Sequence, residues 1–347
     1  MPRRIEAVAP TRIDFAGGTI DLWPLYLLHD APLTVNAAID LPARAVVEDA
    51  AGGVEIVSRD RGARIGPVPP ERLAAEARQA TADLEFPLRL AAHFLGGAGP
   101  PGAAGGRSCR ITTDCAAPAG SGLGGSSALG IALASALDRY VERGLAPEAL
   151  LALTRAIETQ VLRIPTGEQD YHPALRGGVL ALHYTVEGTR AERLAVDLEE
   201  LRRRTVLVYT GVSRSSGVSN WDMLKRHVDG DPVVSKALGG IVRATRVMRT
   251  ALLAADWEAA GEALAEEWIQ RRRLSDKVTT PAIDGLIAAA LTAGAAAGKV
   301  CGAGGGGCLV LWVRQGKRAA VEERVRRAGG KVLDFRYVET GVGVTES

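Results

Sequence analysis

The chain has 347 residues, of which 47% are hydrophobic and 24% charged, so it can bury a large core without disulfides or structural metals. Its 42 Lys and Arg residues nearly balance its 40 Asp and Glu residues, which argues against a nucleic-acid or membrane partner. No apolar run reaches 18 residues, and the four cysteines lack metal-site spacing. We therefore expect a cytoplasmic protein with reduced thiols.

Turn residues divide the first half of the chain into short strand-like segments and longer helical ones. A predicted strand that carries Arg12 runs into Gly17 and Gly18. Further strands are predicted over residues 33–39, 43–48, 54–57, 107–113 and 178–184. Helices are predicted over residues 71–94 with a break at Pro87, over 126–143 and over 148–164, with a glycine-rich loop at 96–106.

In the second half, a charged stretch at residues 199–204 precedes a predicted strand at 205–210. The elements predicted after it are helices at 233–254, 256–276 and 281–297, a strand at 308–313, a helix at 317–328 and a strand at 332–338. This order predicts an α+β layer in each half, with a domain boundary near 190–204. The arginine runs 202–204 and 271–273 are predicted to lie on solvated faces.

Two glycine-rich segments indicate a phosphate site. Residues 118–128 read PAGSGLGGSSA between a predicted strand and a helix that Ser126 or Ser127 could cap. A helix N-terminus offers unpaired N–H groups, and glycines let a phosphate approach them closely. Residues 302–307, GAGGGG, precede the strand at 308–313. Either segment alone could be an ordinary turn, but nine ordered glycines in two short stretches favour a bound ligand.

Three other nucleotide-binding folds are excluded by what surrounds these glycines. No GK[ST] sequence occurs, so a Walker A loop is absent. The first lysine is Lys225, and HRD and DFG are missing, which excludes a protein kinase. Gly120, Gly122 and Gly125 satisfy GxGxxG, but the acid near the required distance, Asp138, lies inside a predicted helix. The context therefore does not fit a Rossmann fold.

Phosphoryl transfer to an alcohol needs a carboxylate that takes or orients the hydroxyl proton, and Glu158 and Asp170 are the candidates. Arg12 beside such a carboxylate would keep it ionised. Each residue also has an ordinary structural interpretation. Glu158 could pair with Arg155 one helical turn earlier, and Asp170 could be a turn or cap residue.

Taken together, these motifs resemble the GHMP kinases, the superfamily of galactose, homoserine, mevalonate and phosphomevalonate kinases. PAGSGLGGSSA resembles their phosphate loop, and KVCGAGGGGCLVLW resembles their C-terminal glycine loop. The segments RIDFAGGTIDLWPLYLLHDAPLTVNAAID and IETQVLRIPTGEQD are similar to the branch of D-glycero-D-manno-heptose 7-phosphate kinases. The similar segments span most of residues 9–315.

The resemblance implies a two-layer α+β fold, with an N-terminal nucleotide-binding domain (1–195) and a ferredoxin-like C-terminal domain (196–347). It implies Asp170 as the base with Arg12 as its partner, and Mg²⁺ held by Ser126, Ser127 and Glu158. The ATP-binding residues that it implies are Pro118, Gly120, Ser121, Gly122, Leu123, Gly124, Gly125, Ser126, Ser127, Gly304 and Gly305. The substrate-binding residues that it implies are Gly17, Gly18, Asp21, Gly167 and Arg214.

The activity implied is ATP- and Mg²⁺-dependent phosphorylation of a hydroxyl, in this branch the anomeric one, of a sugar or sugar phosphate. Three positions depart from the branch, one of them the Thr19-Ile20 pair in place of the commoner Gly-Thr. Glu168 replaces a common cation, which disfavours a phosphorylated acceptor if its side chain lines the pocket, and Asp14 replaces the commoner Ser. A kinase of an unphosphorylated sugar such as a hexose and a non-catalytic sugar sensor therefore stay open, as does a homo-oligomer.

Overall fold

The computed structural model of the chain describes residues 3–96, 107–212 and 217–347. Its larger sheet has eight strands in the order β12-β1-β2-β5-β3-β4, and β6 pairs with both β2 and β7. The strands of this sheet are β1 (Arg4–Ala16), β2 (Leu33–Asp49), β3 (Val54–Ser58), β4 (Ala63–Val68), β5 (Cys109–Cys115), β6 (Val179–Thr185), β7 (Gly188–Leu194) and β12 (Gly343–Glu346).

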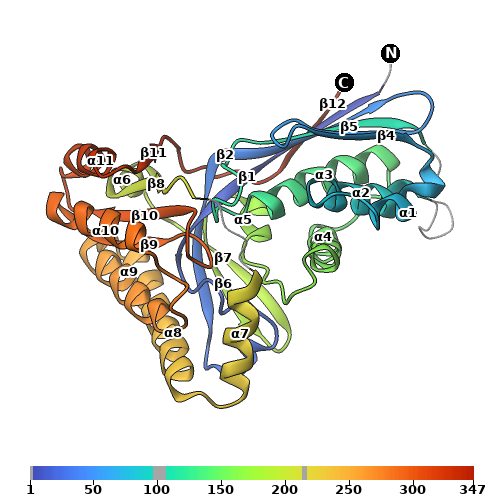
Figure 1. The fold of residues 1–347 in the computed structure, drawn as a ribbon. Helices are drawn as coiled ribbons and strands as arrows, with labels where there is room; N and C mark the ends of the chain where they lie inside the picture. Colours follow the sequence, from blue (N-terminus) through green and yellow to red (C-terminus); the bar gives the residue numbers. More distant parts are fainter. Residues whose placement is uncertain (1–2, 97–106, 213–216) are drawn as a thin grey trace.

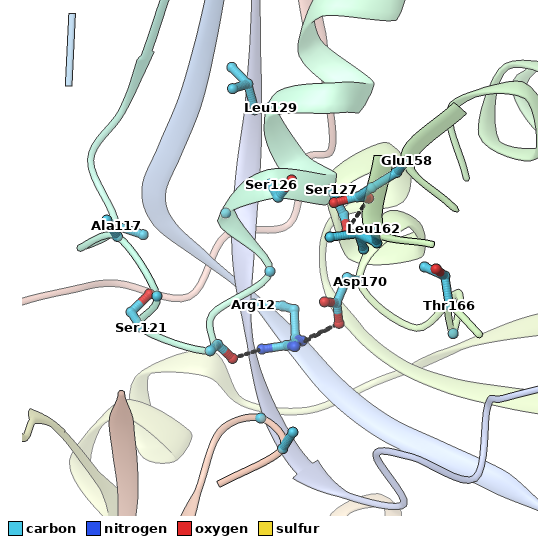
Figure 2. Close-up of a pocket in the computed structure, with 18 of the residues that line it drawn as sticks. Arg12, Ala117, Ser121, Ser126, Ser127, Leu129, Glu158, Leu162, Thr166 and Asp170 are labelled. Atoms are coloured by element: carbon cyan, nitrogen blue, oxygen red, sulfur yellow. Dashed lines mark hydrogen bonds and ion pairs between the residues drawn. The ribbon is translucent and has the colours of Figure 1, made fainter. Parts of the chain in front are cut away.

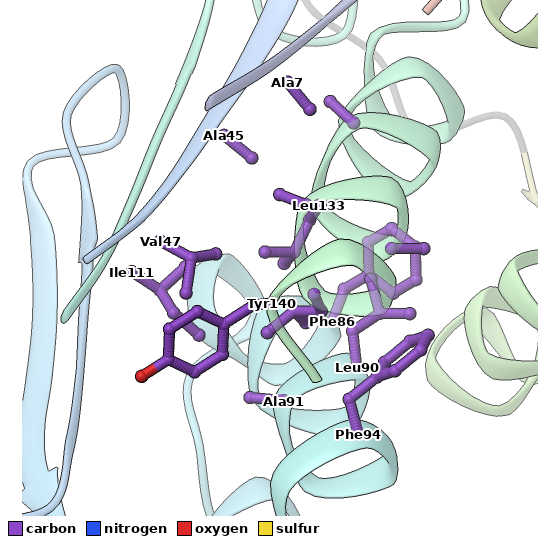
Figure 3. Close-up of a cluster of buried hydrophobic side chains, with 14 of the residues drawn as sticks. Ala7, Ala45, Val47, Phe86, Leu90, Ala91, Phe94, Ile111, Leu133 and Tyr140 are labelled. Carbon is purple, nitrogen blue, oxygen red and sulfur yellow. The ribbon is translucent and has the colours of Figure 1, made fainter. Parts of the chain in front are cut away.

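Helices of the first half pack on this sheet and enclose its main core (Figure 1). The central helix α3 contacts β1 and β2, and its buried Leu133 and Tyr140 meet Phe86 of α2 and Val47 of β2 (Figure 3). Packing at α3 fixes the glycine-rich turn that precedes it. The helices of this half are α1 (Leu73–Ala77), α2 (Ala82–Leu95), α3 (Gly125–Val141), α4 (Pro147–Leu162) and α5 (Tyr171–Arg176), with 3-10 turns η1 (Leu25–Leu28) and η2 (Pro70–Arg72).

The second sheet has four antiparallel strands in the order β11-β8-β10-β9, which is the strand order of a ferredoxin-like layer. Its strands are β8 (Thr205–Tyr209), β9 (Ala295–Val300), β10 (Cys308–Val313) and β11 (Lys331–Leu333). The remaining helices are α6 (Leu198–Arg204), α7 (Gly217–Val228), α8 (Pro232–Leu253), α9 (Trp257–Arg272), α10 (Pro281–Ala293) and α11 (Arg318–Arg327). The predicted α+β class, with a ferredoxin-like second half, is confirmed.

The two layers meet along β1 and β2. These long strands contact α3 and also the C-terminal helices α8 and α9. The last strand, β12, returns from the second half to pair with β1 (Figure 1). The division of the chain at residues 195 and 196 stays a prediction. Across the described ranges, no helix combines the length and apolarity needed to cross a membrane.

Several element boundaries differ from the predicted ones for identifiable reasons. β2 is one strand rather than two, because it continues through 40–42 opposite a register shift in β1. The helix predicted at 71–94 breaks before Thr81 rather than at Pro87, which α2 accommodates in its interior. The alanine-rich helix predicted to reach residue 297 ends at Ala293, because Gly294 caps it with a φ of +113°. Strand β9 begins at the next residue. Residues 97–106 of the predicted loop lie outside the described residues.

Candidate active site

A pocket of about 360 Å³ lies where the two layers meet. Its walls come from β1, the loop before α3, the helix α4, the segment 164–170 and the glycine loop at 302–306 (Figure 2). Segments far apart in the sequence therefore converge on one cavity, whose volume lies in the range of small-molecule sites.

The turn before α3 forms one wall from backbone atoms. Gly120, Gly122 and Gly124 have φ of +65°, +74° and +73°, the left-handed conformation that glycine adopts without strain. Gly124 is the N-cap of α3, so the predicted capping role of Ser126 or Ser127 is wrong. Both serines lie within the first helical turn and line the pocket, where helical N–H groups also lack intrahelical partners.

The second glycine loop packs directly against this turn. The N–H of Cys308 donates to the Ser121 carbonyl at 2.7 Å. A Cβ atom added to Gly307 would lie 2.6 Å from the same carbonyl oxygen, and one added to Gly122 would lie 3.3 Å from the Gly302 nitrogen. Gly307 therefore has no room for a side chain and Gly122 has little, because the backbones of the two loops approach closely.

Arg12 connects these loops to Asp170 (Figure 2). Its Nε donates to Asp170 Oδ1 at 2.8 Å, and its terminal nitrogen donates to the carbonyls of Gly122 at 2.5 Å and Cys301 at 3.1 Å. Burial lowers the pKa of Arg12, but the charges of Asp170 and Asp14 outweigh burial and raise it overall. The guanidinium thus stays charged while it joins both glycine loops to one carboxylate.

Asp170 also lies against the turn before α3. A Cβ atom on Gly124 would lie 3.2 Å from the Asp170 carboxyl carbon. Asp170 stands at the N-cap position of α5, yet its side chain makes no capping hydrogen bond. The carboxylate is therefore held by Arg12 and is open to the pocket.

Glu158 is buried beside the serines rather than paired with Arg155. Its Oε2 accepts hydrogen bonds from Ser127 Oγ at 3.1 Å and from the Tyr171 hydroxyl. Burial raises the pKa of Glu158, although hydrogen bonds from Ser126, Tyr171 and Ser127 oppose the shift. A carboxylate beside two hydroxyls, all lining the pocket, is a set of hard oxygen donors that fits Mg²⁺.

Asp21 lines the same pocket beside Gly167 and Gln169, and we call this part of the pocket the acceptor end. Its Oδ1 accepts the N–H of Thr19 at 3.1 Å, and its Oδ2 accepts the N–H of Gln169 at 3.0 Å. A Cβ atom on Gly167 would lie 1.9 Å from Asp21 Oδ2, so only glycine permits this approach. Burial, reinforced by nearby acids, raises the pKa of Asp21 to about 6.

Most predicted site residues gather in the pocket, and a few do not. Leu123 and Gly305, predicted for ATP, and Gly17, predicted for substrate, are not among the lining residues. Leu123 is a core residue whose carbonyl accepts the N–H of Arg12. Arg214 lies outside the described residues.

Glu168 does not line the pocket, so its negative charge does not disfavour a phosphorylated acceptor. The side chain turns away and accepts hydrogen bonds from Arg155 of α4 and from Thr189 of β7. Its neighbours Gly167 and Gln169 do face the pocket. The charge of Glu168 is thereby compensated within the protein wall.

A buried group of four charges at the acceptor end was not predicted. Lys299 Nζ donates to Asp14 Oδ2 at 3.0 Å and to Glu267 Oε1 at 3.3 Å. Glu267 also pairs with Arg271, which is 2% exposed, so the predicted solvated position of Arg271 is wrong. In the sequence, only the Asp at position 14, where the branch commonly has Ser, indicated this group. The other three charges lie on β9 and α9, far along the chain.

Two glycine loops, an arginine-held carboxylate and an oxygen-donor set define a phosphotransferase that acts on a hydroxyl group. Comparison with known families agrees. The "GHMP kinases N terminal domain" matches residues 87–178, and "GHMP kinases C terminal" matches residues 248–331. Together they cover just over half of the chain.

The chain belongs to the GHMP kinases, and the expected class of enzyme, an ATP-dependent small-molecule kinase, is confirmed. Kinases of this family use ATP as phosphate donor, generally with Mg²⁺.

Similar proteins include sugar and mevalonate kinases. D-glycero-alpha-D-manno-heptose 7-phosphate kinase of Campylobacter jejuni is 29% identical over 229 residues, 65% of this chain and 67% of its own. Mevalonate kinase of Thermococcus sibiricus is 27% identical over 66% and 67% of the two chains. The structure of a D-glycero-D-manno-heptose 1-phosphate kinase from Bacteroides thetaiotaomicron has a TM-score of 0.76 at 23% identity, covering 98% of both chains. Lactococcus lactis galactokinase, solved with galactose, also has a TM-score of 0.76, at 17% identity and covering 98% and 95%.

Proposed function

We propose that this protein transfers the γ-phosphoryl group of ATP to the anomeric hydroxyl of a sugar or sugar phosphate, most like D-glycero-D-manno-heptose 7-phosphate. The observation that carries the proposal is the position of Asp170. Its carboxylate lies against Gly124 of the glycine-rich turn, is held by Arg12, and shares the pocket with Asp21. A base between a phosphate cradle and a hydroxyl-binding end is the arrangement that transfer to an alcohol requires.

In this proposal, the triphosphate lies on the backbone N–H groups between Gly120 and Ser127, which carry the partial positive charge of a helix N-terminus. Ser126, Ser127 and Glu158 would hold Mg²⁺, which neutralises phosphate charge when bound. Tyr171 keeps Glu158 aimed at the serines through its hydrogen bond to Oε2. The nucleobase would occupy the pocket end lined by Ser58, Asp60, Arg61, Asp83, Phe86 and Pro87.

Asp170 accepts the proton of the acceptor hydroxyl while the hydroxyl oxygen forms a bond to the γ-phosphorus. The bond between the γ-phosphorus and the oxygen that bridges it to the β-phosphate breaks. ADP leaves, and the phosphorylated sugar retains the oxygen of its former hydroxyl. Arg12 fixes the direction of the base, because its three guanidinium nitrogens contact the Asp170 carboxylate and the two loop carbonyls at once. Asp21 orients the acceptor by accepting hydrogen bonds from other hydroxyls.

An unphosphorylated sugar is the second candidate acceptor. In the described ranges, each cationic side chain that lines the pocket is already paired with an acid: Arg12 with Asp170, Arg61 with Asp60 and Asp83, and Arg271 with Glu267. No uncompensated cation there is available for an acceptor phosphate. A sugar sensor without catalysis is disfavoured by the complete base and metal-ligand set.

The test is a coupled ADP-release screen with MgATP over free D-glycero-D-manno-heptose, its 7-phosphate, D-mannose and D-galactose. We expect turnover with one heptose form above all hexoses, and ³¹P NMR of the product should show an anomeric phosphate. A higher rate with the free heptose would select the second candidate. Tight binding of a sugar, with no ADP formed from ATP in the presence of any sugar, would contradict the kinase proposal and favour a sensor.

A further inference from the structure

The acceptor end of the pocket has a floor, which we define as Asp14, Gly18, Asp21, Gln169 and Arg271. All five line the pocket, and they come from β1, the loop after it, the segment before α5, and α9. A Cβ atom on Gly18 would lie 2.4 Å from Asp14 Oδ2 and 2.8 Å from Gln169 Nε2. Asp14 and Gln169 are thus immediate neighbours across Gly18.

Two oxygen atoms of this floor lack hydrogen-bond partners. Among the described residues, Asp14 Oδ1 and Gln169 Oε1 are buried and accept no hydrogen bond. The other oxygen of Asp14 accepts from Lys299, and the Gln169 backbone is held by Asp21 and by Asn36. A buried acceptor without a donor is costly, and more so when it is charged. Both oxygen atoms can accept hydrogen bonds from a bound molecule that supplies donors.

The charges around the floor are already balanced. Lys299 bridges Asp14 and Glu267, and Arg271 pairs with Glu267. Arg271 also donates to the Gly18 carbonyl at 2.6 Å and to Thr19 Oγ1 at 3.1 Å, which fixes the loop that carries Asp21. Burial raises the pKa of Asp14, but Lys299, Arg271 and Arg12 outweigh it and lower the pKa overall. The donor that Asp14 Oδ1 requires is consequently a neutral one.

We infer that Asp14 and Gln169 determine acceptor specificity, with Asp14 Oδ1 and Gln169 Oε1 accepting hydrogen bonds from two neighbouring sugar hydroxyls that are not phosphorylated. The inference rests on the proposed sugar kinase function. Acidic oxygens repel a phosphate, so any phosphate on the acceptor points away from this floor and toward the pocket mouth. The ligand class is a polyhydroxylated chain or ring whose hydroxylated face meets the floor.

Removal of either hydroxyl from the acceptor leaves a buried oxygen unsatisfied, and a site built this way discriminates strongly. The wild-type enzyme should therefore prefer the best acceptor of the screen over its monodeoxy analogues at these two positions by roughly 10- to 100-fold in kcat/KM. For a heptose acceptor, the analogues are the 2-, 3- and 4-deoxy compounds.

The test compares these preferences in Asp14→Ser and Gln169→Met. Asp14→Ser should abolish the preference at one hydroxyl, and Gln169→Met at the neighbouring one, while KM for ATP stays unchanged. Thr113→Val is the matched control, because Thr113 Oγ1 is also buried without a partner but lies outside this pocket. This control should keep every preference of the wild type.

The inference is overturned if both variants lower kcat/KM by the same factor for the acceptor and every analogue, because a purely structural role predicts that result. If Asp14→Ser does not fold, Asp14→Ser/Lys299→Met removes both paired charges, and Gln169→Met leaves all four charges in place. Failure of the proposed function would look different, since the wild type itself would then phosphorylate no sugar.

Discussion

The two ends of the pocket are built in opposite ways. The phosphate end consists of backbone, with three left-handed glycines before α3 and a second glycine loop packed on them. Apart from Gly18, the acceptor floor consists of residues that present polar side chains, and four buried charges from β1, β9 and α9 hold it. Backbone N–H groups bind a phosphate regardless of the molecule that carries it. Side-chain oxygens at fixed positions distinguish one arrangement of hydroxyl groups from another.

This difference separates chemistry from specificity within one cavity. Arg12 lies at the junction, because it contacts both glycine loops through carbonyls and the base through its carboxylate. Substitutions at the phosphate end should impair turnover with every acceptor, and those at the floor should re-rank acceptors. Variants at the two ends of the pocket should therefore differ in which of these two properties they change.

Asp170→Asn should lower kcat by about 10²- to 10⁴-fold with every acceptor, because the amide cannot take the hydroxyl proton. ATP affinity, measured by calorimetry, should stay within about twofold of wild type, since the amides that bind phosphate are untouched. Asp114→Asn is the control, because this exposed acid of β5 lies outside the pocket. Near wild-type turnover of Asp170→Asn would remove Asp170 as the base.

Gly122→Ala should weaken ATP binding by roughly 10- to 100-fold, because the added methyl lies between the two glycine loops and displaces amides that hold phosphate. Gly144→Ala is a matched control with φ of +68° and open space around its Cβ position. Both variants carry the strain of alanine at positive φ, so that strain alone does not explain a difference in ATP affinity between them. Equal ATP affinities in the two variants would contradict the backbone cradle.

The pH dependence of kcat/KM for the acceptor should show a limb near pH 6 at saturating MgATP. The raised pKa of Asp21 means that acidification below about 6 protonates it and removes a hydroxyl acceptor, so the ratio should fall about tenfold between pH 7 and 5. Asp21→Asn should flatten that limb. The sign for stability is opposite: the folded state binds this proton more tightly, so ionisation of Asp21 costs stability as pH rises from about 4 through 6.

Tyr171→Phe should raise the Mg²⁺ concentration for half-maximal activity by about three- to tenfold, because Glu158 loses the hydroxyl that orients it. Turnover at saturating Mg²⁺ and the ranking of acceptors should change little. A titration of activity against free Mg²⁺ measures the shift. An unchanged midpoint would show that Ser126 and Ser127 position Glu158 without Tyr171.

The phosphate end could be predicted from sequence because its signal is local. Each glycine loop is contiguous and lies beside a strand that the pattern of apolar residues also indicated, as at Cys308–Val313. Arg12, Glu158 and Asp170 could be named as candidates. The sequence could not show that Asp170 lies against Gly124. It also could not show that Glu158 has Tyr171, rather than Arg155, as its partner.

Gly18 and Asp21 of the acceptor floor could be named from the N-terminal motif. The charged groups that support the floor could not be predicted, because their contacts join residues up to 285 positions apart. Lys299 lies on β9, a strand hidden in an alanine-rich stretch that favours helix until Gly294 ends it. Arg271 belongs to a run of three arginines that resembles a solvated helix face, but it is buried in the folded protein, where α9 packs against α8, β9 and β1. Tertiary structure, rather than local preference, decides such positions.

The most direct test of the account is a crystal structure of the protein with Mg²⁺ and a non-hydrolysable ATP analogue. We expect the triphosphate on the amides between Gly120 and Ser127, with the metal beside Glu158 and the γ-phosphate facing Asp170. A triphosphate bound elsewhere, or a γ-phosphate directed away from Asp170, would contradict it.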